Sequence, residues 1–154
     1  MTRLLAVHAH PDDIEILAGG TLALLAGRGA KRELGFPDST LELSPLSDAE
    51  LARFYGGATA VLVPSRYEGF GLPALEAMAC GAPVVTSRGG ATEEVAGGAA
   101  VLVDPLDPAS IVAGIEGAGA RRGELRELGF ARAAAFSWDE TARRTVEVYR
   151  EASG

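Results

Sequence analysis

Residues 60–87, AVLVPSRYEGFGLPALEAMACGAPVVTS, decide the fold class of this 154-residue chain. Ala60–Pro64 is apolar and rich in β-branched residues, as expected for a strand that is covered on both faces. Pro73 stands where the first turn of a helix favours proline, and Gly81 ends that helix. The apolar run Pro83–Thr86 then predicts a second strand. Strand, helix and strand in this order are typical of a parallel α/β sheet.

The same alternation continues on both sides of this stretch. Further strands are predicted at Arg3–His8, Thr40–Leu43 and Ala100–Val103. Helices are predicted at Ile16–Arg28, 49–55, Thr92–Ala96, Pro108–Glu116, Arg121–Ala135 and Trp138–Glu151, with Ser47 or Asp48, Asp107 and Ser137 as N-caps. We therefore predict one α/β domain over residues 1–154. It should be a Rossmann-like three-layer sandwich with about five parallel strands and helices on both faces.

Composition excludes several classes of protein. A net charge of −7 argues against nucleic acid or an anionic membrane surface as a partner. The longest apolar stretch, Ile16–Gly27, is too short to span a bilayer. With Cys80 as the single cysteine, a disulfide framework is excluded. Met1–Val7 has no basic run and no cleavable apolar region, so a reducing, cytoplasmic location is expected. Lys31 is the single lysine, so an anion site has to rely on arginine or on backbone amides.

The loop after the strand Ala60–Pro64 carries the candidate binding residues. Ligands of open parallel sheets bind beyond the carboxyl ends of the strands, where such loops lead into helices. Gly69 and Gly71 allow a close approach of the backbone and a positive φ, and the amides at the following helix start favour a phosphate. Glu68 in the loop and Glu76, expected in the first helical turn, are good acceptors for sugar hydroxyls. This combination suits a sugar nucleotide.

Two alternatives to a sugar-nucleotide site stay open at this point. The loop could be a solvated helix N-terminus at which the acids only complement the helix dipole. Gly69, Gly71 and Ala74 also spell G-x-G-x-x-A, a dinucleotide-binding pattern. We disfavour it because the distance along the chain from Pro64 is too long for the tight turn of that fingerprint.

From about residue 33 to the C-terminus, the chain resembles the C-terminal, donor-binding domain of GT-B-fold glycosyltransferases of family four. The similar segments are SDAELARFYGGATAVLVPS (47–65), SRYEGFGLPALEAMACGAPVV (65–85), RGGATEEVAGGAAVLVDPLDPASI (88–111) and FSWDETARRTVEVYREA (136–152). The resemblance implies that Glu76 binds the donor ribose. It also implies that Glu68, with the backbone of Gly69, Phe70, Gly71 and Leu72, faces the transferred sugar and the pyrophosphate. Ser44 and Pro45 would meet the base.

The resembled family transfers a hexosyl group from a nucleotide sugar with retention and requires no metal cofactor. Two of its features are missing from the sequence. No Gly-Arg…Lys motif for the pyrophosphate follows Val7, so Arg66 or Arg88 is the candidate substitute. The acceptor-binding domain is also absent, so the chain alone is not expected to complete the transfer.

Residues 3–29, RLLAVHAHPDDIEILAGGTLALLAGRG, resemble the start of LmbE-type zinc N-deacetylases. That resemblance implies zinc ligation by His10 and Asp13, with Asp12 as the general base. The third protein ligand of that family, a downstream histidine, has no counterpart, since His8 and His10 are the only histidines. We therefore expect a chimera-like chain, deacetylase-like over 1–30 and transferase-like over 31–154. A zinc-dependent deacetylase remnant and an inactive recombined scaffold are the alternative functions.

Three expectations concern the remaining residues. Arg88-Gly89-Gly90 with Glu93 fits either a further element of the transferase family or a plain turn with a helix cap. Cys80 should be packed in the core and not act as a nucleophile. Trp138 should anchor the last helix on the core, and an exposed apolar face of that helix would provide for self-association.

Overall fold

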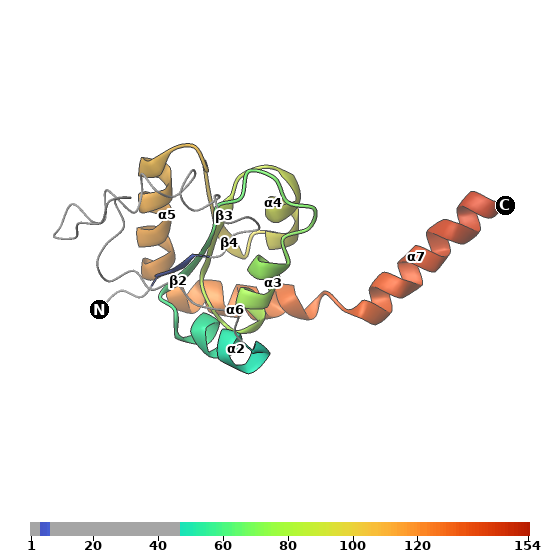
Figure 1. Cartoon of the computed structure of the whole chain (residues 1–154), viewed down its shortest axis with the longest axis horizontal. Helices are drawn as coiled ribbons and strands as arrows, with labels where there is room; N and C mark the ends of the chain where they lie inside the picture. The colour runs from blue at the N-terminus through green and yellow to red at the C-terminus, as the bar shows by residue number, and fades with distance from the viewer. Residues whose placement is uncertain (1–3, 7–46) are drawn as a thin grey trace.

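The computed structural model describes residues 4–6 and 47–154, with the backbone alone for residues 4–6. Within these described residues, four parallel strands form one sheet in the order β1-β2-β3-β4 (Figure 1). They are β1 Leu4–Ala6, β2 Ala60–Val63, β3 Val84–Ser87 and β4 Ala100–Val103. The prediction of a parallel α/β sheet is confirmed. The strand predicted at Thr40–Leu43 and the helix predicted at Ile16–Arg28 lie outside the described residues.

The helices of the described part are α2 Asp48–Gly57, α3 Leu72–Ala79, α4 Gly90–Ala96, α5 Pro108–Ala120, α6 Arg122–Ala134 and α7 Trp138–Ser153. Helices α2, α5 and α7 begin after the predicted caps Ser47, Asp107 and Ser137. Glu50 accepts a hydrogen bond from the Ser47 amide at 2.9 Å, the return contact of a capping box. The Asp107 side chain caps α5, and the Ser137 hydroxyl caps α7.

Helices cover both faces of the sheet. On one face, α2, α3 and α4 pack on alternate strand residues such as Val61 and Val84. On the other face, α5 packs through Ile111 on Leu62 and Val85. Strands β2 and β3 are buried on both sides, which is why their sequences are continuous apolar runs and not alternating ones.

Helix α6 contacts the segment before β2 and the helices α3 and α4. The Arg122 guanidinium donates to the backbone carbonyls of Ala58 and Thr59, just before β2 begins. Gly129 allows close packing on α3, because a Cβ there would lie 3.3 Å from the Cβ of Met78. At its other end, α6 is attached to α4 through Arg132.

Helix α7 extends away from the body of the molecule and ends at the C-terminus (Figure 1). None of its residues is buried, and the Trp138 side chain is 80% exposed. The prediction that Trp138 anchors this helix on the core is therefore wrong. The reason is that the backbone is extended at Ser137, with φ −147° and ψ 152°, and α7 leaves the body from there, so Phe136 and not Trp138 contacts the body (Figure 1).

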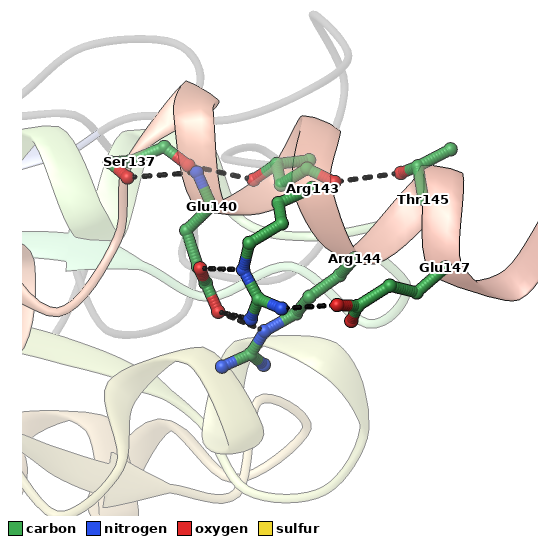
Figure 2. A network of polar contacts seen from close by, with 7 residues as sticks. Ser137, Glu140, Arg143, Arg144, Thr145 and Glu147 are labelled. Carbon is green, nitrogen blue, oxygen red and sulfur yellow. Dashed lines mark hydrogen bonds and ion pairs between the residues drawn. The ribbon is translucent and has the colours of Figure 1, made fainter.

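The polar face of α7 is stabilised within the helix itself (Figure 2). Glu140 pairs with Arg143 and Arg144, and Arg143 also reaches Glu147. Hydrogen bonds from Arg143 and Arg144 lower the pKa of Glu140 to about 2. These charges are thus neutralised along one side of the helix, while Val146, Val148 and Tyr149 are exposed.

Candidate functional site

The loop between β2 and α3, residues 64–71, lies at the carboxyl end of the sheet, as the sequence predicted. The loops that follow β3 and β4 leave the sheet at the same edge because the strands are parallel. Pro64 and Ser65 are buried at the start of the loop, whereas Arg66, Tyr67, Gly69 and Phe70 are exposed. The loop therefore offers both backbone and side chains to solvent.

The two loop glycines have different roles. Gly71 has φ +95°, and a Cβ at this position would lie 3.0 Å from Cγ2 of Thr92 in α4. Both the left-handed conformation and the close contact require glycine there. Gly69 does not have a positive φ, and a Cβ there would meet nothing within 4 Å. Of the two glycines, Gly71 alone has the positive φ that the sequence analysis allowed for. Gly69 leaves open space beside its backbone.

The start of α3 presents unpaired backbone donors. Gly71 is the N-cap and has no side chain, and proline occupies position 73. Among the described residues, none accepts a hydrogen bond from the amides of Gly69, Phe70, Gly71 or Leu72. Such amides at a helix N-terminus point toward an anion and favour a phosphate.

Glu68 is half-buried and fixed from within the loop. Its carboxylate accepts a hydrogen bond of 2.9 Å from the hydroxyl of Ser65, which is itself 3% exposed. Because one carboxylate oxygen can take several hydrogen bonds, this contact orients Glu68 and leaves acceptor capacity for a ligand hydroxyl. Ser65 is a site residue that the sequence analysis did not single out.

Glu76 lies in the second turn of α3, not in the first as predicted. The helix begins at Leu72 because Gly71 takes the left-handed conformation, which makes Glu76 the fifth helical residue. The Tyr55 hydroxyl, from α2, donates a long hydrogen bond of 3.4 Å to the Glu76 carboxylate. Burial, together with the charge of Glu76, raises the pKa of Tyr55 far above its usual value, so the phenol stays a donor.

Tyr55 was also missed from the sequence, since a tyrosine on the apolar face of a helix looks like an ordinary core residue. Cys80 is partly buried and packs against the core cluster that contains Tyr55, as predicted. Burial and the nearby Glu76 carboxylate raise the pKa of the Cys80 thiol. The thiolate is the reactive form of cysteine, so a raised pKa lowers the reactivity of Cys80.

The remaining predicted residues fall into two groups. Ser44, Pro45, His10, Asp12 and Asp13 lie outside the described residues, so the base contact and the zinc site stay predictions. In the described ranges, no cluster of three metal-ligating side chains is found. Arg66 and Arg88 are both exposed at the carboxyl edge.

The loop after β3 contains a helix cap. The Gly89 amide donates to the Glu93 carboxylate at 2.5 Å, as in the cap alternative that the sequence left open. Beyond the ends of β3 and β4 lies an open cleft of about 530 Å³. It is lined by Arg88, Gly89, Asp104, Pro105 and Ser110. This lining places an arginine near the edge of the sheet where a ligand would bind.

Comparisons with known proteins decide the family. The model of the family described as glycosyl transferases group 1 matches residues 28–128. The chain belongs to this family. It is 45% identical over 127 residues to the MMP alpha-(1->4)-mannosyltransferase of Mycolicibacterium hassiacum, covering 78% of this chain and 31% of the relative. It is 43% identical over 148 residues to a D-inositol 3-phosphate glycosyltransferase of Nocardioides sp., covering 93% of this chain and 31% of the relative.

Among solved structures, this chain resembles sucrose-phosphate synthase from Thermosynechococcus elongatus. The TM-score is 0.76 at 25% identity, and the match covers 97% of this chain and 45% of that protein. The chain spans about a third of the length of the two curated relatives.

The comparisons give no support to a deacetylase-like N-terminal segment. An alignment over 93% of the chain has to include most of the first thirty residues, and that relative is named a glycosyltransferase. The strand β1 also pairs with β2 in the same sheet, Leu5 opposite Val61. Neither observation calls for a junction between two families.

Among the helices of the described ranges, none combines the length and the apolar composition that a membrane span needs.

Proposed function

We propose that this chain forms the donor-binding part of a retaining glycosyltransferase and binds a nucleotide sugar at the loop between β2 and α3. The observation that carries the proposal is the start of α3. Gly71 caps the helix without a side chain, so the backbone amides of residues 69–72 are available to a diphosphate. The family membership supports the same ligand class.

Two carboxylates complete the proposed site. Glu76 would accept hydrogen bonds from the ribose hydroxyls, and Tyr55 holds its carboxylate from the neighbouring helix. Glu68 would face the transferred sugar, with Ser65 fixing its orientation. Both acids are thus held by a hydroxyl group and keep further lone pairs for a sugar.

The charge of the pyrophosphate needs more than amides. Arg88, beside the cleft at the end of β3, and Arg66, in the binding loop, are the described arginines closest in sequence to the strand ends. We propose that one of them supplies the positive charge. The names of the relatives, a mannosyltransferase and a D-inositol 3-phosphate glycosyltransferase, favour hexosyl transfer as the reaction of the whole enzyme.

Isothermal titration calorimetry tests the proposal directly. The full chain is titrated with a panel of uridine, guanosine and adenosine diphosphate sugars. At least one should bind, and Glu76→Ala should weaken its binding by about 1–3 kcal/mol, because ligand hydroxyls lose their acceptor. Glu116→Gln, a change at an exposed glutamate of α5, serves as the matched control and should leave affinity unchanged. Absence of heat with every donor would contradict the proposal.

Two other predictions keep their own tests. A zinc-dependent deacetylase remnant requires stoichiometric zinc after purification, and this zinc should be lost in His10→Ala.

Self-association through α7 is supported by the exposed Trp138, Val146 and Tyr149. Sedimentation equilibrium of the wild type against a variant with Val146→Ser and Tyr149→Ser measures it, and a monomeric wild type would end that prediction.

A further inference from the structure

The binding loop has one side-chain contact that the proposed function does not use. Phe70 stands between Gly69 and Gly71, so it carries the only side chain of that three-residue stretch. Its ring meets the Phe136 ring edge-to-face, with centroids 5.8 Å apart and an interplanar angle of 86°. Phe136 belongs to the short connection between α6 and α7. A residue far along the chain therefore contacts the loop close to the start of α3.

Phe136 is itself held in place by a contact with Arg132. The Arg132 guanidinium lies 4.7 Å from the centre of the Phe136 ring. Arg132 also donates to the backbone carbonyls of Val95 and Glu94, each at 2.7 Å, at the end of α4. A guanidinium with two carbonyl acceptors and a ring against it has little rotamer freedom. Arg132 thus holds the Phe136 ring against Phe70 in the absence of a ligand.

We propose that Phe136 is a positioning residue for the donor loop and links the occupancy of that loop to the connection that carries α7. This inference rests on the proposed function. Glycines leave the backbone free to adopt many conformations, so the amides of residues 69–71 need an external contact to stay aimed at an anion. The Phe70 ring, held against Phe136, provides that contact. In return, a donor that shifts the loop moves Phe136 and the residues beside it.

Variants at Phe136 test the positioning role by donor affinity in the full chain. Phe136→Leu keeps an apolar side chain but removes the ring, and should weaken nucleotide-sugar binding roughly 3- to 10-fold. Phe136→Tyr keeps the ring and should restore wild-type affinity. The matched control is Phe130→Leu, on α6, where Arg126 also stacks on a phenylalanine, at 5.4 Å, but beside Gly81 at the far end of α3. That control should bind the donor as the wild type does.

The coupling has a spectroscopic signature that a purely structural role would not produce. Trp138 is the single tryptophan of the chain, lies two residues after Phe136 and is 80% exposed. Saturating nucleotide sugar should change its fluorescence in the wild type and in Phe136→Tyr, and much less in Phe136→Leu. Wild-type affinity together with an unaltered fluorescence response in Phe136→Leu would overturn the inference.

Hydrogen exchange separates this inference from the proposed function. In the ligand-free chain, the amides of Ala74 and Leu75 donate to the carbonyl of Gly71 at the end of the loop. Phe136→Leu should speed the exchange of these two amides at least several-fold relative to Phe130→Leu, because the loop loses its contact at Phe70. If no donor binds the wild type, the proposed function fails, and this exchange result still decides the positioning role. Equal exchange in the two variants would overturn the role of Phe136 whether or not a donor binds.

Discussion

Replacing Gly71 with alanine should destabilise the fold through two effects at one atom. For residues other than glycine the left-handed region costs about 1–2 kcal/mol, and φ +95° lies within that region. The new Cβ would lie 3.0 Å from Cγ2 of Thr92. Relieving that overpacking adds about 1 kcal/mol. The reduced freedom of the unfolded chain offsets roughly 0.5 kcal/mol.

The net loss for Gly71→Ala is therefore about 2 kcal/mol, which lowers Tm by roughly 4–8 °C in a chain of this size. Urea denaturation followed by circular dichroism measures the free energy of unfolding. Gly69→Ala is the matched control in the same loop, because nothing lies within 4 Å of its Cβ and its φ is not positive. It should change stability by less than about 1 kcal/mol.

A second substitution separates the two effects. Thr92→Ser removes the crowded methyl group but keeps the hydroxyl, which donates to the Ser87 carbonyl at 3.3 Å. In the Thr92→Ser background, the cost of Gly71→Ala should fall by about 1 kcal/mol, the overpacking part. Equal costs for Gly71→Ala and Gly69→Ala, or no destabilisation by either, would refute the account of this helix start.

Three further predictions concern helices α6 and α7. Arg122→Ala should cost about 1–3 kcal/mol in urea denaturation, since it removes the hydrogen bonds from the guanidinium to the carbonyls of Ala58 and Thr59. A stability equal to the wild type would show that these hydrogen bonds contribute nothing. Arg143 and Arg144 hold the Glu140 pKa near 2, below the ordinary 4.5. The ion pairs of α7 should therefore be fully formed above pH 4.5 and be lost as the pH falls toward 2. An NMR titration of the Glu140 carboxyl carbon with a midpoint near 4.5 would contradict this prediction. Trp138→Ser should leave the free energy of unfolding within about 0.5 kcal/mol of the wild type, because the side chain is exposed, whereas a large loss would reinstate it as an anchor.

Local patterns in the sequence predicted the elements of the described part well. Apolar, β-branched runs predicted the strands β2 to β4 to within one or two residues, since strands buried on both faces leave few other choices. The side chains of Ser47, Asp107 and Ser137 marked helix starts because capping depends on neighbours along the chain.

Contacts between distant segments were beyond the sequence patterns. Tyr55 meets Glu76 across two helices, and Phe136 meets Phe70 from a distant part of the chain. Neither pair has a fixed spacing that a motif could display. The error at Trp138 has the same origin, because the amphipathic pattern of α7 does not show which distant residues the helix contacts, and none of its residues is buried.

The most direct test of the donor site is an amide chemical-shift titration of the full chain with a nucleoside diphosphate. The account predicts the largest shifts at residues 69–72, whose amides are free of described acceptors, and smaller shifts at Glu76 and Tyr55. It also predicts that the exposed side of α5, represented by Glu116, stays unmoved. Shifts confined to other parts of the chain, or none at saturating diphosphate, would contradict it.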